Sequence, residues 1–224
     1  MPKRIKMKGP LIPNNSQEAY DYFGLEAVSA RSIAEALPED NSDIVLEVNS
    51  TGGLVTVGSE IYTTLRNYAG KVTAEITGMA ASAASVAVMG ADKVIISPTA
   101  QMMIHKALFS YVSGNSDDLD KASNALKASD QAIVNAYVEK TGMSEDDIMA
   151  LMKAETYMSA QDAVDKGFAD EIMSFDDVEA VASIGNGILP QAVIDDFYAN
   201  RSKRKSEIQN MLREIEKEEI LQGL

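Results

Sequence analysis

Residues 78–90, GMAASAASVAVMG, are mostly Ala, Ser and Gly and follow the β-branched segment KVTAEIT. A helix with so few bulky side chains adds little volume to a core. Its backbone must therefore approach a neighbouring element closely, or the helix must display one of its serine hydroxyls. The two serines are Ser82 and Ser85. The rest of the chain has to decide between these two interpretations.

Apolar segments alternate with helical patterns over the first half of the chain. Such an alternation predicts an α/β domain with crossover connections, in which functional side chains gather at the carboxyl ends of the strands. We predict strands within residues 1–13 and at 43–48, 71–78, 93–98 and 101–105, and helices from Ser29 to the residue before Pro38, after Gly53 and after Ser82.

The second half of the chain is mainly helical. One long helix is predicted at about 116–140 and ends at Gly142, and two shorter helices begin at the capping serines Ser144 and Ser159. A last strand or edge segment is predicted at 168–175. The long helix at 116–140 has an apolar stripe, which consists of Leu119, Ala122, Leu126, Ile133, Val134 and Tyr137.

The composition then changes towards the C-terminus. We predict one domain over residues 1–182, followed by a linker and a charged helical tail over 183–224. The tail has a narrow apolar seam at Ile208, Leu212 and Ile215, which requires a partner, either the body of this chain or another subunit.

Charge and composition exclude several classes of protein. The net charge is −14, from 20 Lys and Arg against 34 Asp and Glu, which argues against a general affinity for nucleic acid or anionic membranes. There are no cysteines, and no apolar run is long enough for a secretory signal or a membrane span. One histidine with scattered acids does not make a zinc or calcium site. We therefore expect a cytoplasmic protein without metal or cofactor.

Two features together suggest a catalytic site. Ser82 lies where the strand turns into the small-residue helix, and His105, the only histidine, ends the predicted strand QMMIH. Alone, the serine fits a helix cap or a close-packing site, and the histidine fits an ordinary structural residue. Together they offer a hydroxyl nucleophile at a helix N-terminus and an imidazole to accept its proton.

The glycine pair after the strand at 43–48 suggests the remaining part of such a site. Gly52 and Gly53 allow the backbone to approach a substrate carbonyl closely. We expect the amides of Gly53 and Ala83 to hold the oxyanion of a tetrahedral intermediate. Ser85, one helical turn beyond Ser82, is the competing nucleophile.

Four segments, NSTGG, GMAAS, MMIHKA and ETYMSAQDAVDKGFAD, occur in this order between about residues 43 and 172. They resemble the Clp-type (ClpP-like) serine peptidases. The resemblance implies a crotonase-like α/β fold, a repeated β-β-α superhelix, whose subunits assemble into rings and cleave peptide bonds inside a chamber. It also implies that Ser82 is the nucleophile, His105 the general base, and that Glu155 stands where the family has the third, aspartate, member of the triad.

Two departures from the family pattern narrow the prediction. NNSQEAYDYFG, residues 14–24, replaces the gate loops that meet an ATP-driven unfoldase, and the charged tail is an addition. Both features are similar to the head-maturation (prohead) proteases of tailed phages, so we predict ATP-independent processing of capsid or scaffold proteins. The alternatives are an ATP-dependent Clp proteolytic subunit, which would need an unfoldase, and a catalytically silent assembly module.

Two further enzyme classes share a related fold. Signal-peptide peptidases use a serine with a lysine, for which Lys93 or Lys106 would be available, but they need membrane access. Acyl-CoA hydratases and isomerases need no serine beside a histidine, so the pairing of Ser82 with His105 disfavours them.

Overall fold

A mixed sheet of mainly parallel strands forms the centre of the fold. The computed structural model describes residues 2–175, and within them seven strands form one sheet. Five of these strands follow one another in the order β1–β2–β3–β4–β7, and each neighbouring pair is parallel. β5 continues the sheet beside the end of β3, and β6 pairs antiparallel with β5. The strands are β1 (Lys3–Lys8), β2 (Ile44–Ser50), β3 (Val72–Ala81), β4 (Lys93–Ile96), β5 (Gln101–Ile104), β6 (Thr156–Met158) and β7 (Glu171–Ile172).

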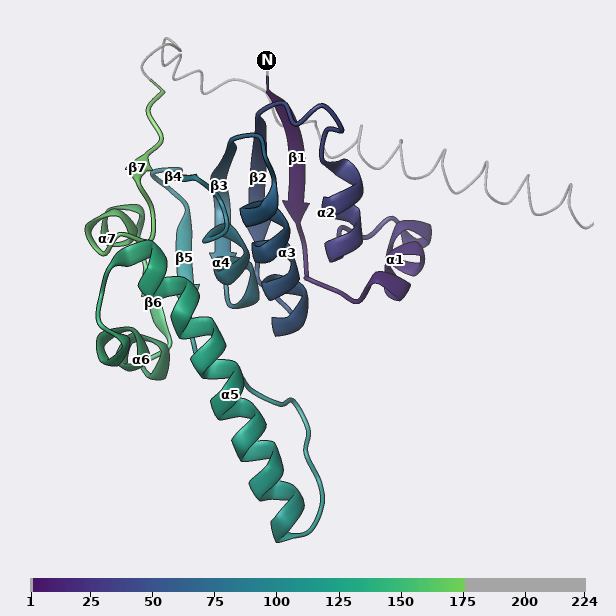
Figure 1. Cartoon of the computed structure of the whole chain (residues 1–224), viewed down its shortest axis with the longest axis vertical. Coiled ribbons are helices and arrows are strands. Elements are labelled where there is room, and N and C mark those ends of the chain that lie inside the picture. The colour runs from purple at the N-terminus through teal and green to yellow at the C-terminus, as the bar shows by residue number, and fades with distance from the viewer. Residues whose placement is uncertain (1, 176–224) are drawn as a thin grey trace, which may run out of the picture. The chain divides into compact units, whose positions relative to one another are not determined.

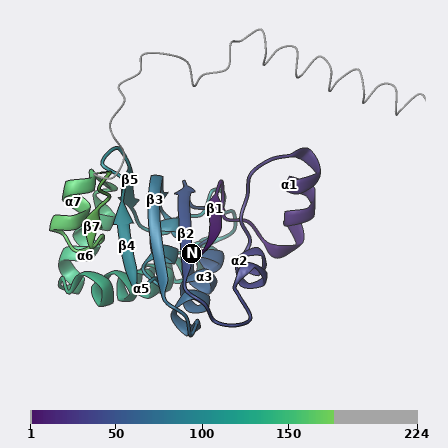
Figure 2. The same ribbon diagram turned by 90° about the horizontal axis from the view of Figure 1, so that it is seen from above.

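The helices α3 and α4 pack on one face of the central strands (Figures 1 and 2). The capping serines Ser29, Ser144 and Ser159 each accept a backbone N–H at the start of a helix, as predicted. The helical elements are a 3-10 turn η1 (Asn14–Ser16), α1 (Gln17–Phe23), α2 (Ala30–Ala36), α3 (Val55–Asn67), α4 (Ala83–Val88), α5 (Ser116–Thr141), α6 (Glu145–Lys153) and α7 (Ala160–Asp165).

The small-residue helix α4 is buried along its whole length, and α3 lies directly against it. A Cβ on Gly58 of α3 would lie 2.4 Å from the carbonyl oxygen of Ala83, and a Cβ on Gly90 would lie 2.5 Å from the carbonyl oxygen of Tyr62. The close approach of two backbones, one of the two interpretations of this stretch, is therefore present.

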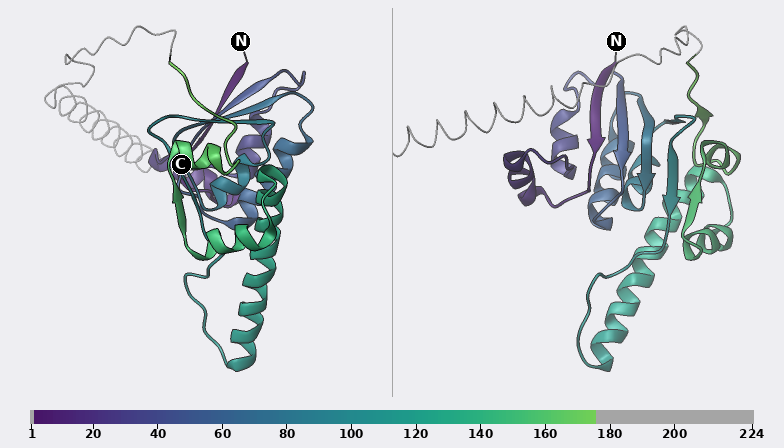
Figure 3. Two further views of the ribbon diagram at one scale, coloured as in Figure 1. Left: turned by 90° about the vertical axis from the view of Figure 1, so that its left-hand side faces the viewer. Right: turned by 180° about the vertical axis from the view of Figure 1, so that it is seen from behind.

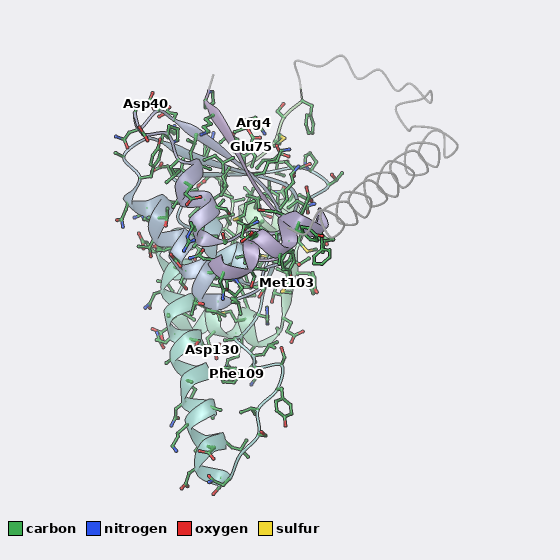
Figure 4. All side chains as sticks on the ribbon, turned by 90° about the vertical axis from the view of Figure 1, so that its right-hand side faces the viewer. Arg4, Asp40, Glu75, Met103, Phe109 and Asp130 are labelled. Carbon is green, nitrogen blue, oxygen red and sulfur yellow. The ribbon has the colours of Figure 1, made fainter. Side chains whose placement is uncertain are left out.

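In the described residues no helix covers the opposite face of the sheet (Figure 3, right). This face carries charged side chains. Arg4 of β1 pairs with Glu75 of β3 at 2.5 Å and with Glu47 of β2 at 3.7 Å, and Lys8 also pairs with Glu47. Figure 4 shows Arg4 and Glu75 side by side. These pairs are partly exposed, so each stabilises the fold by only about 0–1 kcal/mol.

The long helix α5 lies against the body with its second half, while its first half extends away from it (Figures 1 and 3). Ile133, Val134 and Tyr137 of the predicted stripe are buried, whereas Leu119 is 46% exposed. The helix ends where Gly142 adopts a left-handed conformation at φ 70°. The apolar stripe was therefore predicted correctly, but only its second half has a partner in the described chain.

Three elements have no counterpart in the sequence analysis: η1, α1 and β6. α1 has no buried residue, so no apolar periodicity marks it, and β6 is too short to show an alternating pattern. The predicted tail at 183–224 lies outside the described residues. Among residues 2–175, no helix has the length and apolar content needed to cross a membrane.

Candidate active site

Ser82 occupies a sharp turn between β3 and α4. Its backbone has φ 55° and ψ −130°, a conformation that residues with a Cβ rarely adopt. The turn is held by hydrogen bonds on both sides: the N–H of Ser82 donates to the carbonyl of Met103 at 2.9 Å, and the carbonyl of Ser82 accepts from the N–H of Ser85 at 2.9 Å. Strain of this kind costs about 1–3 kcal/mol and is concentrated at functional sites.

His105 directly follows β5, the strand that pairs with the end of β3. The register Ala80–Met102 and Ala81–Met103 brings the residues after both strands together. As a result, Nε2 of His105 lies 2.7 Å from Oγ of Ser82, within hydrogen-bonding distance. Both side chains are half-buried, so this pair is accessible from the cleft beside it. The structure thus brings the two residues together that the sequence singled out.

Ser85 has a different environment from Ser82. It is fully buried, and its hydroxyl donates to the carbonyl oxygen of Ser82 at 2.6 Å. The hydroxyl of Tyr137 lies 2.8 Å from the same Oγ. Because Ser85 uses its hydrogen on the carbonyl, Tyr137 is the donor to Ser85. Burial raises the pKa of Tyr137 well above its ordinary value, which keeps the hydroxyl protonated. Ser85 is therefore a structural serine.

Gly52 lies against the Ser82 turn, and Gly53 lies against the backbone of Leu11. A Cβ on Gly52, whose φ is 89°, would lie 2.5 Å from the carbonyl oxygen of Ala81 and 2.7 Å from Cβ of Ser82. The amide of Gly52 donates to Oγ of Ser50 at 3.1 Å. In residues 2–175 no acceptor is recorded for the amides of Gly53 or Ala83. These two amides remain free to bind an oxygen of a substrate.

Glu155 has no direct contact with His105 in the described chain. It is exposed, has φ 50°, and immediately precedes β6. β6 pairs antiparallel with β5 in the register Ile104–Thr156, so extending this ladder by one residue puts Glu155 opposite His105. No hydrogen bond or ion pair between the two side chains is recorded in this part of the chain. The structure therefore brings Ser82 and His105 into contact, while Glu155 is related to His105 only through the backbone register of β5 and β6.

A cleft of about 680 Å³ opens over the serine and the histidine. Its lining includes Ser82, His105, Gly53 and Ala83, and most of the remaining lining is apolar. The apolar lining includes Leu11, Ile12, Leu54, Val55, Val86, Leu108, Phe109, Leu126 and Ile133. The cleft has the size and lining of a small-molecule or side-chain binding site.

The sequence analysis missed Asp130 on α5. Its side chain is buried, its Oδ1 accepts the N–H of Ala107 at 2.8 Å, and its Oδ2 pairs with Nζ of Lys106 at 2.9 Å. A signal was present, because Asp130 stands three residues before Ile133 on the apolar stripe of the helix. A charged residue at a core position of a helix needs a buried partner.

Comparison with known proteins identifies relatives over most of the chain. A family model described as Clp protease matches residues 27–176. The ATP-dependent Clp protease proteolytic subunit 1 of Chlamydia muridarum is 32% identical over 168 residues, covering 70% of this chain and 88% of that protein. The protein of the same name from Protochlamydia amoebophila is 27% identical over 200 residues, covering 80% of this chain and 97% of that protein. The one from Streptomyces avermitilis is 30% identical over 166 residues, covering 73% of this chain and 76% of that protein. The chain, with its paired serine and histidine at the end of a mainly parallel sheet, therefore belongs to the Clp protease family.

Proposed function

We propose that this chain is a serine endopeptidase that cleaves peptide bonds through an acyl-enzyme. The observation that carries the proposal is the 2.7 Å contact between Oγ of Ser82 and Nε2 of His105, at the start of α4. A serine hydroxyl is a weak nucleophile until a neighbouring base accepts its proton, and His105 is the only imidazole in the chain. Family membership supports the same reaction class.

The reaction follows from the groups around Ser82. Nε2 of His105 accepts the proton as Oγ of Ser82 attacks the scissile carbonyl, and the carbonyl oxygen acquires negative charge. The free amides of Gly53 and Ala83 stabilise this charge, by about 3 kcal/mol for each donor if they act like other oxyanion donors. The protonated imidazole then gives its proton to the departing amine. Water then attacks the ester while Nε2 of His105 accepts its proton. The imidazolium returns a proton to Oγ of Ser82, and the acyl product leaves as a carboxylic acid.

Glu155 is proposed as the third member of the triad. The antiparallel register that puts it opposite His105 supports this role. Its carboxylate would accept the N–H of Nδ1, which keeps Nε2 free as the proton acceptor, and would stabilise the imidazolium that forms. Glutamate is one methylene longer than aspartate, so its carboxylate can reach the ring from a more distant backbone.

The apolar part of the cleft supports a substrate class. Val86, Leu126 and Ile133 line it next to the serine. We expect a peptide with a large apolar side chain on the amino side of the scissile bond, because that side chain would fill the cleft and remove apolar surface from water.

We further propose a ring of identical subunits with a crotonase-like superhelical core. Large apolar side chains are exposed on the first half of α5 and on the segment that precedes it, as expected for surfaces that meet another copy. They are Leu108, Phe109, Tyr111, Val112 and Leu119. Sedimentation velocity of the purified protein tests this: a monomer at micromolar concentration would contradict the ring.

Two roles differ in whether the peptidase needs an ATP-driven unfoldase as a partner. The prediction from the sequence is ATP-independent processing of phage capsid or scaffold proteins. The printed names of the relatives favour the alternative, an ATP-dependent Clp subunit that works with an unfoldase. Degradation of a folded protein only when a Clp ATPase and ATP are added would establish the alternative, whereas cleavage of co-expressed capsid proteins without ATP would establish the first role.

The decisive experiment is labelling with a fluorophosphonate, followed by peptide mapping. The parent and the Ser85→Ala variant should be labelled at Ser82, and Ser82→Ala should not be labelled. A peptide library should be cleaved by the parent and not by Ser82→Ala. Labelling at Ser85, or no labelling of an assembled sample, would overturn the proposal and favour a catalytically silent assembly module.

A further inference from the structure

Asp130 connects α5 to the segment that carries the histidine. Its carboxylate is 3% exposed and binds the amide of Ala107 and the ammonium of Lys106, the two residues that directly follow His105. Figure 4 shows Asp130 on α5, near Phe109 of the segment that runs beside the helix. The carboxylate therefore fixes the backbone immediately after the imidazole.

Tyr137 connects the same helix to the segment that carries the serine. Its hydroxyl donates to Ser85, and Ser85 donates to the carbonyl of Ser82. The Tyr137 ring is 1% exposed and packs edge-to-face on Phe168, with the ring centres 5.4 Å apart. The ring therefore has little freedom to move, and its hydroxyl holds the strained nucleophile turn through one intervening serine.

Asp130 and Tyr137 lie on one face of α5. Seven residues separate them, which is about two helical turns, and the buried residues Ile133 and Val134 lie between them. One rigid helix thus contacts both catalytic segments through buried polar groups. The hydrogen bonds of these groups are made within the described chain, as they must be, since burying a polar group costs free energy unless its hydrogen bonds are made.

We infer that α5 sets the distance between Ser82 and His105, with Asp130 and Tyr137 as positioning residues. This inference rests on the proposed function for its catalytic meaning. Displacement of a reacting group by about 1 Å can cost about a hundredfold in rate. Loosening either connection should therefore lower kcat, while KM, which depends on the cleft, stays near the parent value.

Matched controls are available in the same molecule. Asp170 also accepts a backbone amide, from Val94, and a lysine of α5, Lys140, but it lies away from the cleft. Tyr62 donates to Glu139 of α5, again away from the catalytic segments. Asp170→Asn and Tyr62→Phe therefore remove similar contacts from the same helix without touching Ser82 or His105.

The experiment compares kcat and KM for Asp130→Asn, Ser85→Ala and Tyr137→Phe with these two controls. We expect kcat to fall about tenfold to a hundredfold in the first three variants, with KM within about twofold of the parent. The double variant Ser85→Ala/Tyr137→Phe should be no slower than the slower single variant, because both residues belong to one connection. Equal kcat values in test and control variants, or a rise in KM alone, would overturn the inference.

A spectroscopic readout keeps this test separate from that of the proposed function. The chain has one histidine, so ¹⁵N-labelled histidine gives one pair of ring-nitrogen signals. The signals should move in Asp130→Asn and Tyr137→Phe and stay in place in Asp170→Asn and Tyr62→Phe. If the parent neither cleaves peptides nor reacts with the fluorophosphonate, the proposed function fails, and these signals still decide the positioning role: shifts confined to the test variants support it, and unchanged signals overturn it.

Discussion

Ser82 and Glu155 both have a positive φ, 55° and 50°, although neither is a glycine. Ser82 contacts His105, and Glu155 falls opposite His105 when the β5–β6 ladder is extended by one residue. Their surroundings differ. The Ser82 turn is held by the carbonyl of Met103, by the buried Ser85 and by the imidazole. At the Glu155 turn, the N–H of Glu155 donates to the carbonyl of Met152 at 3.2 Å and the N–H of Ala154 to the carbonyl of Ala150 at 3.1 Å, but the Glu155 side chain is exposed.

The difference shows how this fold distributes strain around a reactive centre. A strained residue persists where its surroundings determine its conformation several times over, as at Ser82. At Glu155 few contacts determine the carboxylate, so any approach to the imidazole depends on the backbone register of β5 and β6. The proposed nucleophile is therefore preorganised, while the third member of the proposed triad has freedom to move.

The largest effect is expected when the space beside Ser82 is filled. Gly52→Ala would put a Cβ 2.5 Å from the carbonyl oxygen of Ala81 and 2.9 Å from the amide of Ala83, and backbone atoms cannot move aside easily. We expect a loss of about 3 kcal/mol in the free energy of unfolding, together with most of the activity. Urea denaturation measures the loss in the free energy of unfolding. Gly24→Ala is the control, because Gly24 has φ 66° but nothing within 4 Å; equal losses would refute the argument.

The next effect concerns the carboxylate of Glu155. Glu155→Gln keeps the size of the side chain and removes its charge, so it should lower kcat by about tenfold to a hundredfold. This fall in kcat is smaller than the fall caused by removing the charge of a rigidly held triad aspartate. Steady-state kinetics on a peptide substrate measures this. Glu39→Gln, a change at an exposed acid outside the site, should have no effect. A Glu155→Gln enzyme with full activity would show that serine and histidine suffice.

Glycine substitutions compare the strain at the two turns directly. Glycine tolerates positive φ, so Glu155→Gly should be more stable than Glu155→Ala by about 1 kcal/mol. The free energy of unfolding of Ser82→Gly should exceed that of Ser82→Ala by about 2 kcal/mol, because φ 55° with ψ −130° lies outside the left-handed helical region, in a region where only glycine is at ease. Thermal and urea unfolding of the four variants measure both differences. Equal stabilities within a pair would mean that the turn relaxes without glycine.

The smallest effect concerns the hydroxyl that supports the Ser82 turn. The folded-state pKa of Tyr137 is raised by burial above its unfolded value of 10.0, so its contribution to stability is complete below about pH 10 and is lost as the pH rises further. At about pH 10.5 the parent should lose about 0.8 kcal/mol relative to Tyr137→Phe, which has no ionisable group there. Urea unfolding of both proteins at about pH 8 and pH 10.5 measures the change; parallel losses would contradict it.

Much of the fold was predictable because its signals are local. The capping serines Ser29, Ser144 and Ser159, the left-handed Gly142 and the apolar segments that form β2 to β5 are each marked by adjacent residues. β6 and α1 were not predicted, because three residues show no period and an exposed helix shows no apolar face. Asp130 was overlooked since its partners, Lys106 and Ala107, lie more than twenty residues away in sequence.

The sequence by itself determined the alternation of strands and helices, the small-residue start of α4, and the choice of Ser82 and His105 as the pair proposed to carry the chemistry. Only the tertiary structure decided that Ser85 is a structural serine, that Asp130 and Tyr137 bind the segments next to Ser82 and His105, and that Glu155 is related to His105 through the β5–β6 register without a bond to the imidazole. The physical reason is distance along the chain. Propensities and caps act within a few residues, whereas these roles depend on pairings and packing between segments that only folding brings together.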